Sequence, residues 1–365
     1  MTRERLGAAV SFLLLLLMLI ALMVFTGSVW SLLGMLLMVL LPAVSAVANL
    51  YVRKHLRAGI EMATTTAKGT AIECIVHIYN DGWLPVVRCF TEVEITNDLT
   101  GEREKISLAG GAGARKSFTH SFLIQSRYCG RLYVAVRRIS LMDYFGLISV
   151  KADVRASARI TVLPELFPVD ADMGTAASYS DDGVADRKGD DRSEVFALRE
   201  YRAGDDVRQI HWKLSAKLDE LIIREAGTPE TRSLLVVWDK RINGTPAQMD
   251  ALAEAVSSVC MGLTNNGILY SISWTGEEEP EIEDVADENG LLQAIPALVK
   301  NAGSPECRLP NMEQYSRILY FGVRPDDKLA EDFRFHFVIC SDGDVSGATT
   351  FTPKNYKEIL QRLEV

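Results

Sequence analysis

Two long stretches without a single charged side chain open the sequence, and they constrain the fold more than any other feature. The first covers residues 6–25 and the second covers residues 29–50. At about 1.5 Å of rise per residue, a helix of either length crosses the roughly 30 Å hydrocarbon core of a bilayer. A break at residues 26–28, Thr-Gly-Ser, separates them. We therefore expect a hairpin of two transmembrane helices within residues 1–57.

A cleaved signal peptide is the alternative for the first stretch. Such a peptide has a shorter apolar region and a cleavage site of small residues, and polar mature sequence follows it. Here the second apolar stretch follows almost at once, and this favours the hairpin.

Positive charge flanks the hairpin at its two free ends. Arg3 and Arg5 precede the first stretch, and Arg53, Lys54 and Arg57 follow the second, whereas the connection carries no cation. Because cationic flanks stay on the cytoplasmic side, we expect a multi-pass protein of the cell membrane whose soluble domains are cytoplasmic.

The cysteines favour the same compartment. They are scattered, with no C-x-x-C pair and no short Cys/His cluster, which is typical of reduced, mostly buried thiols and not of disulfides or a zinc site. The six are Cys74, Cys89, Cys129, Cys260, Cys307 and Cys340.

Residues 60–165 alternate between apolar and polar side chains with a period of two. The alternation is clearest at residues 72–78, 89–95, 132–136 and 159–163, and runs rich in Asn, Asp and Gly separate these segments. Several short strands at this spacing predict an antiparallel β-sandwich of immunoglobulin type.

Residues 166–194 are rich in Asp, Gly and Ser and poor in apolar residues, so we interpret them as an acidic linker. They lack the regular D-x-D-x-D-G spacing of a calcium loop.

Residues 195–231 form the most unusual segment of the chain. Opposite charges alternate densely around two aromatic side chains, and a turn signal at residues 204–206 precedes a short expected helix from near Val207. A strand is expected at residues 221–223. We expect ion pairs here that bind a partner or stabilise the fold. The residues concerned are Arg199, Glu200, Tyr201, Gly204, Asp205, Asp206, Arg208, His211, Trp212, Lys213, Arg224 and Glu225.

A catalytic pair is the alternative function for this segment. His211 with Asp205 or Asp206 would serve a cell-envelope hydrolase. Yet no Ser or Cys nucleophile lies in a recognisable turn, and the chain has no Walker loop, H-E-x-x-H, G-x-S-x-G or dinucleotide motif. We therefore expect a protein that is not an enzyme and needs no cofactor.

The last part of the chain, residues 232–365, alternates between strand and helix patterns. Such alternation predicts an α/β domain with a parallel sheet and helices on both faces. The expected strands are residues 234–238, 268–274, 318–321 and 335–340, and the expected helices are residues 247–263, 291–299 and 356–363.

The run LREYRAGDDVRQIHWKLSAKLDELIIRE at residues 198–225 resembles the signature of the bacterial domain-of-unknown-function family numbered fifty-eight. Lys217 replaces the usual arginine, which keeps the charge but loses the bidentate fork. An upstream element also resembles that family, with Arg127 and Gly130 followed by D-Y-F-G-L at residues 143–147. The two apolar stretches, the β domain and this run follow one another in the order found in that family, so the resemblance covers nearly the whole chain.

The resemblance implies a von Willebrand factor A-like fold for the last domain. That fold often binds a divalent cation through D-x-S-x-S after its first strand. Here Asp239 is followed by Lys240, and Arg241 and Asn243 replace the hydroxyl ligands. Because the cations would repel a metal ion, we predict no metal site.

The resemblance also implies partners. Such proteins resemble accessory factors of MoxR-type AAA+ ATPases, often beside transglutaminase-like membrane proteins. We therefore expect a membrane-tethered, non-enzymatic adaptor, with a structural organiser of a membrane complex as a further alternative. The net charge of −9 argues against nucleic acid as a partner.

Overall fold

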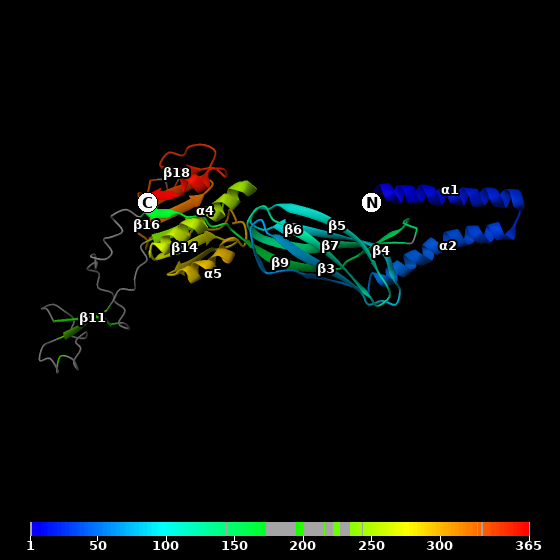
Figure 1. The fold of residues 1–365 in the computed structure, drawn as a ribbon, viewed down its shortest axis with the longest axis horizontal. Helices are drawn as coiled ribbons and strands as arrows, with labels where there is room; N and C mark the ends of the chain where they lie inside the picture. The colour runs from blue at the N-terminus through cyan, green and yellow to red at the C-terminus, as the bar shows by residue number, and fades with distance from the viewer. Residues whose placement is uncertain are drawn as a thin grey trace. The chain divides into compact units, whose positions relative to one another are not determined.

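The protein is described by a computed structural model (Figure 1). It divides into two compact units, which are described separately below. The first comprises Met1–Glu165, Gly244–Ala253 and Ile295–Ala302, and the second comprises Leu166–Asn243, Glu254–Ala294 and Gly303–Val365. The residues that the structure describes are 2–143, 145–172, 195–200, 215, 222–226, 234–242, 244–326, 328–329 and 331–364.

The first unit begins with the two expected apolar helices. They are α1 (Thr2–Thr26) and α2 (Val29–Val52), and both are long and apolar enough to cross a membrane. Gly27 adopts a φ of 59°, and the Ser28 hydroxyl accepts a hydrogen bond from the Trp30 N–H at 3.3 Å. A left-handed glycine ends one helix and a serine caps the next, so the break between them is encoded locally.

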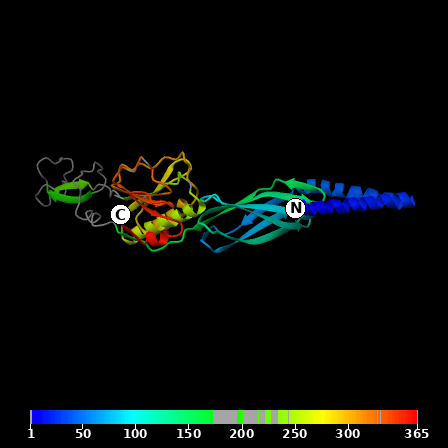
Figure 2. The ribbon, with the colours of Figure 1, turned by 90° about the horizontal axis from the view of Figure 1, so that it is seen from above.

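Two β-sheets follow α2 (Figures 1 and 2). The smaller has the order β1-β3-β6, and the larger has the order β2-β9-β7-β4-β5 with β8 paired to β7. The strands are β1 (Leu56–Glu61), β2 (Thr65–Ala67), β3 (Ala71–Asn80), β4 (Val86–Asn97), β5 (Arg103–Ala112), β6 (Ser117–Gln125), β7 (Gly130–Met142), β8 (Ser149–Ala152) and β9 (Ala156–Leu163).

One hydrophobic core joins the two sheets. Cys74, Val76 and Ile78 alternate inward on β3, and Val93 on β4 and Val134 on β7 belong to the same buried cluster. Burying such a side chain contributes about 1.5–3 kcal/mol. The period of two in the sequence therefore predicted which face of these strands is buried.

One pair of strands in this domain differs from the expectation. An antiparallel sandwich was expected, and the other strand pairs of the two sheets are antiparallel, but β2 pairs with β9 in parallel, with Thr65 opposite Thr161. Alternation of side chains shows where a strand lies and which face it buries, but it contains no information on the direction of the neighbouring strand.

The second unit contains a sheet of order β15-β14-β13-β16-β17-β18, in which β15 is antiparallel to β14 and the other pairs are parallel. All residues of β13 are buried, as expected for a strand covered on both faces. The strands are β13 (Leu234–Trp238), β14 (Tyr270–Thr275), β15 (Pro280–Val285), β16 (Arg317–Gly322), β17 (Phe335–Cys340) and β18 (Ala348–Phe351).

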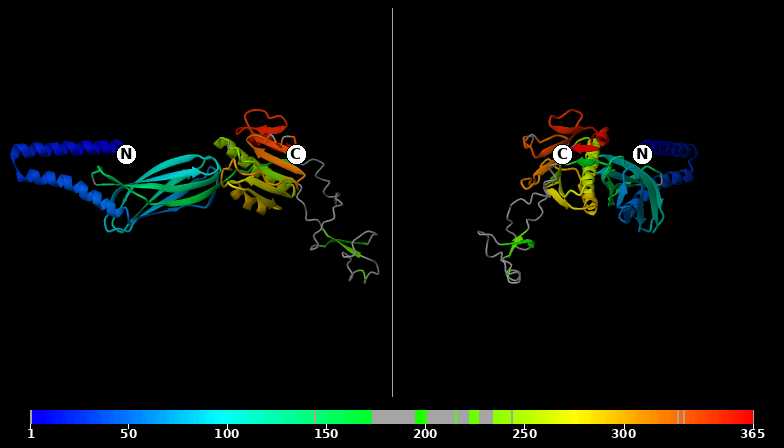
Figure 3. Two further views of the ribbon diagram at one scale, coloured as in Figure 1. Left: turned by 180° about the vertical axis from the view of Figure 1, so that it is seen from behind. Right: turned by 60° about the vertical axis from the view of Figure 1, so that its left-hand side comes forward.

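Three helices accompany this sheet (Figure 3). They are α4 (Pro246–Asn265), α5 (Glu288–Leu298) and α6 (Tyr356–Ile359). The last is shorter than expected, because the chain ends in β19 (Arg362–Glu364) instead of continuing as a helix. The strands β15 and β18 were not predicted, since their burial is partial and their apolar pattern is weak.

The expected acidic linker begins later than predicted. The strand β10 (Asp170–Asp172) pairs in parallel with β19. The Phe167 N–H donates to the Ser258 hydroxyl at 3.1 Å, and the Asn266 amide donates to the Ala171 carbonyl at 3.0 Å. Residues 166–172 therefore pack on α4, and residues 173–194 lie outside the described residues.

Candidate functional site

We call residues 195–231 the signature segment. The structure describes residues 195–200, 215 and 222–226 of it. The strand β11 (Val195–Glu200) pairs antiparallel with β12 (Ile222–Ala226), with Arg199 opposite Ile223 and Glu200 opposite Ile222. This ribbon brings together four of the predicted site residues, Arg199, Glu200, Arg224 and Glu225. The other eight, Tyr201, Gly204, Asp205, Asp206, Arg208, His211, Trp212 and Lys213, lie outside the described residues, as does the helix expected from Val207.

The strand order of the second unit indicates a second candidate site, on its six-stranded sheet. The chain passes from β13 to β14 on one side and reaches β16 on the other side of β13. Open α/β sheets bind ligands at the carboxyl ends of the strands where the order reverses in this way. Asp239 follows β13, and Asp326 lies a few residues beyond β16.

Arg241 joins these two carboxylates. Its Nε lies 3.0 Å from Asp239 Oδ1, and its Nη2 lies 2.7 Å from Asp239 Oδ2. The same Nη2 donates to Asp326 Oδ2 at 2.8 Å. The Arg241 backbone N–H also donates to Asp239 Oδ1 at 2.9 Å, so a tight local turn places the guanidinium. We call Asp239, Arg241, Tyr320 and Asp326 the switch-point cluster.

Tyr320 completes this cluster from the neighbouring strand. It lies on β16, and its hydroxyl donates to Asp239 Oδ2 at 2.5 Å. The Asp239 side chain is only 3% exposed, whereas the side chains of Arg241 and Asp326 are 23% and 22% exposed. The buried carboxylate therefore has three side-chain or backbone donors, and the arginine carries its charge to the surface.

The electrostatics follow from these contacts. The hydrogen bonds to Asp239 and then Asp326 raise the pKa of Arg241, although burial opposes this. Burial, followed by the charge of Asp239, raises the pKa of Tyr320. The hydrogen bond from Arg241 lowers the pKa of Asp326. At neutral pH Arg241 is therefore protonated, Asp326 is ionised and the Tyr320 phenol keeps its proton.

Lys240 does not face solvent beside this cluster. It is fully buried, its N–H donates to the Thr275 hydroxyl at 2.7 Å, and its Nζ lies 4.5 Å from the centre of the Trp238 ring. A Cβ added to Gly303 would come within 2.6 Å of Lys240 Cβ, so only glycine fits against it. This ammonium has an aromatic face beside it, which stabilises a buried cation.

In this arrangement the Asp239 carboxylate pairs with the Arg241 guanidinium of the same chain. The Arg241 guanidinium contacts both oxygens of this carboxylate, which the sequence resemblance places where a metal ligand is expected. Among the described residues no group of three or more His, Cys, Asp or Glu side chains is placed to bind a metal ion. Asn243 lies outside the described residues, and the absence of a metal site stays a prediction.

Sequence reasoning missed Tyr320 and Asp326. Asp239 and Arg241 were identified because the family resemblance implies a cation-binding motif directly after the first strand of the last domain. Tyr320 is one aromatic residue within another strand, and only the sheet order places it beside Asp239.

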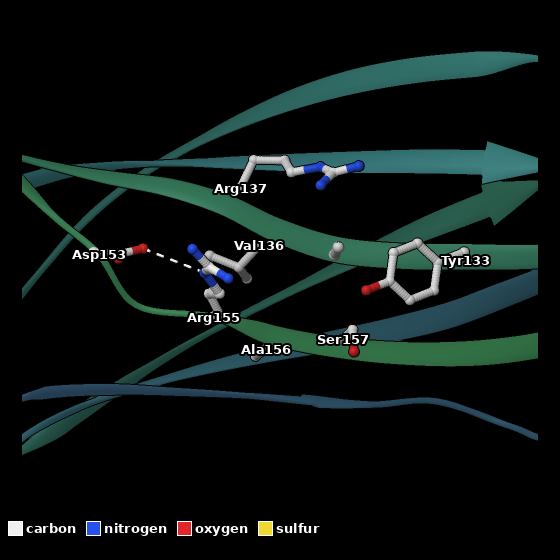
Figure 4. A pocket seen from close by; sticks show the side chains of 8 residues that line it. Tyr133, Val136, Arg137, Asp153, Arg155, Ala156 and Ser157 are labelled. Atoms are coloured by element: carbon white, nitrogen blue, oxygen red, sulfur yellow. Dashed lines mark hydrogen bonds and ion pairs between the residues drawn. The ribbon is translucent and has the colours of Figure 1, made fainter.

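A cleft in the first unit is an alternative site. It has a volume of about 470 Å³ and is lined by Tyr133, Arg137, Arg155 and Ser157 among others (Figure 4). Arg137 pairs with Glu94, and Arg155 lies 3.4 Å from Asp153. Its two arginines thus already have carboxylate partners, and the Arg155 side chain is 86% exposed.

The upstream sequence element has a structural basis in the first unit. Gly130 has a φ of 124°, and a Cβ there would come within 2.5 Å of Asn97 Oδ1. Asp143, which is 2% exposed, accepts hydrogen bonds from the Ile148 N–H at 2.7 Å and the Phe145 N–H at 3.3 Å. Gly146 follows with a φ of 72°. Gly130 therefore fits the start of β7 against Asn97, whereas Asp143 and Gly146 shape the turn between β7 and β8.

Comparison with known proteins finds a family model that matches the region of the resembling sequence run. The model described as "Protein of unknown function DUF58" matches residues 197–266. No curated protein matches this sequence.

The similar solved structures are distant. The CARDB domain of the PF1109 protein from Pyrococcus furiosus is 15% identical, covering 30% of this chain and 87% of that chain, with a TM-score of 0.24. Red sea bream transglutaminase is 14% identical, covering 32% of this chain and 18% of that chain, with a TM-score of 0.22. TM-scores this low decide neither fold nor function.

Proposed function

Because the DUF58 family model matches residues 197–266 of this chain, we propose that it is a member of that family and a membrane-tethered, non-enzymatic adaptor that presents its α/β unit to a partner protein. In this proposal α1 and α2 cross the membrane as a hairpin, and both soluble domains lie in the cytoplasm. The cationic flanks at Arg3, Arg5, Arg53 and Lys54 support that orientation.

The strand order supports a von Willebrand factor A-like fold for the second unit. In chain order the sheet reads third, second, first, fourth, fifth and sixth, with the third strand antiparallel at the edge. This doubly wound order has its ligand position between the first and fourth strands. For the β domain, two sheets around one core support an immunoglobulin-type sandwich.

One observation carries the proposal: the Arg241 guanidinium lies on Asp239 at the switch point. A metal-dependent site would offer its partner a cation held by carboxylates. Here an arginine is fixed by Asp239 and Asp326 through its Nε and Nη2 atoms instead, and the two N–H donors of its Nη1 atom lie outside these contacts. In this proposal these two donors bind an oxygen atom of a partner protein without requiring any reaction.

The partner is a MoxR-type AAA+ ATPase, with a transglutaminase-like membrane protein as a further member of the complex. Charged docking surfaces orient partners and raise association rates, which suits repeated, transient engagement by an ATPase. Ile242 beside the cluster is 37% exposed and adds an apolar contact at the same edge.

Affinity capture of the full chain from native membranes, with and without nucleotide, tests this function. Ile242→Asp changes the exposed side chain beside the switch-point cluster and leaves the ion pairs of Arg241 with Asp239 and Asp326 in place. Leu123→Asp is the matched control, because Leu123 is also exposed but lies on β6 of the other unit. We expect the wild-type chain and Leu123→Asp to recover the ATPase and Ile242→Asp to lose it. Equal recovery by all three chains, or recovery by none, would count against the proposal.

A further inference from the structure

One end of the β domain carries exposed apolar side chains in two separate loops. In the loop between β3 and β4, Trp83 is 72% exposed and Leu84 is 40% exposed. In the turn between β7 and β8, Phe145 and Ile148 are 40% and 41% exposed. Val87, at the start of β4, is 41% exposed as well. We call these five residues the apolar end of the β domain.

The first of these loops is fixed to the end of α2. The Asp81 N–H donates to the His55 carbonyl at 3.0 Å, and the Arg57 Nε lies 2.5 Å from Asp81 Oδ2. A Cβ added to Gly82 would lie 3.3 Å from the Tyr51 ring, so the loop packs against the last turn of the helix. Trp83 therefore lies where α2 leaves the apolar stretch.

The second loop lies against the start of α1. The Phe145 ring centre is 6.5 Å from that of Phe12, with the rings edge to face. A Cβ added to Gly146 would lie 3.6 Å from Ala8 Cβ. In Figures 1 and 3 this green turn lies between the two helices, near the N-terminus. Ala8 and Phe12 belong to the uncharged part of α1, so Phe145 lies at the level of the apolar stretch.

Exposed cations surround these apolar residues. The Arg115 guanidinium lies 4.5 Å from the centre of the Trp83 ring and holds that ring in place. Arg88 faces Met142 across the β4–β7 pairing, at the same end of the sheet. The exposed cations at this end include Arg53, Lys54, Arg88, Arg115 and Lys116, and Arg57 is exposed there as well but pairs with Asp81.

We infer that the apolar end of the β domain is a lipid-binding surface, which inserts Trp83 and Phe145 into the interface of the bilayer that α1 and α2 cross. Tryptophan and phenylalanine at this depth, ringed by arginine and lysine, match the interfacial layer of a membrane with anionic headgroups. The inference rests on α1 and α2 spanning that bilayer and not on any partner of the α/β unit.

The surface also gives the upstream sequence element a function. Asp143 and Gly146 close the β7–β8 turn, and the residue that this turn presents is Phe145. A buried carboxylate and a left-handed glycine thus position one aromatic side chain against α1. The β7–β8 turn thus fixes the β domain to the membrane at a second point, separate from α2. Two points of attachment limit rotation of the β domain about its connection to α2.

Fluorescence quenching in nanodiscs tests the inference on the full chain. The discs contain either zwitterionic lipid or a mixture with anionic lipid, each with and without bromine on the upper acyl chain. The fluorescence of Trp83 is the emission of the wild-type chain minus that of Trp83→Phe, so the emission of the other tryptophans cancels. We expect brominated lipid to remove most of that difference signal, and more of it with anionic lipid. A difference signal that brominated lipid leaves unchanged in both discs would overturn the inference.

Spin labels supply a second measurement that does not depend on tryptophan. Phe145→Cys and Leu123→Cys are labelled in the same discs, and Leu123 serves as an exposed position near the opposite end of the domain, opposite Glu73. We expect the label at 145 to be several-fold more accessible to oxygen, relative to a water-soluble nickel complex, than the label at 123. Equal ratios at the two positions would overturn the inference. Loss of the ATPase partner leaves both measurements unchanged, so the two proposals fail separately.

Discussion

The Arg241 guanidinium donates hydrogen bonds to both carboxylate oxygens of Asp239, two residues earlier in the chain. The pair lies at the carboxyl end of β13, where the strand order of the sheet reverses. The arginine is held again by Asp326, so its position depends on two separate segments. We regard this fixed arginine as the recognition group of the α/β unit.

Removing the arginine should destabilise the second unit strongly. In Arg241→Met the Asp239 carboxylate stays buried and retains Tyr320 as its side-chain donor. Breaking a buried pair in this way costs about 3–5 kcal/mol. Urea unfolding followed by tryptophan fluorescence measures it, because Trp238 and Trp274 are fully buried in the same sheet.

The control for this variant is the double substitution Asp239→Asn with Arg241→Met. It removes the buried charge together with its partner, so we expect it to recover a large part of the lost stability. A single variant as stable as the wild type would show that the pair does not hold Asp239 in place.

The stability of the second unit should depend on pH through Asp326. Its pKa is lowered in the folded chain by Arg241, from a usual value near 3.8. The ion pair therefore stabilises the fold above pH 3.8, and this contribution disappears as the pH falls through the lower, folded pKa. Unfolding in urea at a series of pH values should show a loss below pH 3.8 that Asp326→Asn reduces. An identical pH profile for both chains would contradict the role of the pair.

Gly130 should not tolerate a side chain. Alanine there meets both a φ of 124° and the Asn97 side chain at 2.5 Å. Gly69 is a matched control, since its φ is 75° and nothing lies within 4 Å of an added Cβ. We expect Gly69→Ala to cost about 1 kcal/mol and Gly130→Ala to cost more, about 2–3 kcal/mol, in unfolding experiments. Equal losses would show that the close contact relaxes without penalty.

The helices and strands with a strong apolar pattern could be predicted from the sequence. The helices α1 and α2, the strand β13 and the helix α4 all follow from runs of apolar residues at the right period. All six cysteines are buried, as the sequence predicted for most of them. The switch-point cluster could be predicted only in part, because Asp239 and Arg241 are neighbours in sequence, whereas Tyr320 joins them through strand order.

The pairing partners of weak strands could not be predicted. The strand β10 lies in a segment that is acidic overall, and only Val169 and Ala171 give it buried apolar surface. Its partner β19 is close to the end of the chain, so no local pattern connects the two. Likewise, the edge strand β15 is largely exposed and carries a charged sequence.

The cysteines should be unreactive until the protein unfolds. Burial raises the pKa of Cys74 to about 11 and those of Cys89, Cys260 and Cys340 to about 12. At pH 8 a thiol of pKa 11 is ionised in about one molecule per thousand, and the thiolate is the reactive form. A thiol reagent such as dithionitrobenzoate should react very slowly with the native chain and with all six thiols in guanidinium chloride. Fast reaction in the native state would contradict the described core.

Site-specific photocrosslinking in intact cells tests the central claim most directly. A photoreactive amino acid replaces Ile242 beside the switch-point cluster, and the same substitution at Leu123 on the β domain is the control. We predict a crosslink from position 242 to a MoxR-type AAA+ ATPase, absent from position 123. If position 242 crosslinks only to lipid or to proteins outside the cytoplasm, the α/β unit does not present this edge to an intracellular ATPase.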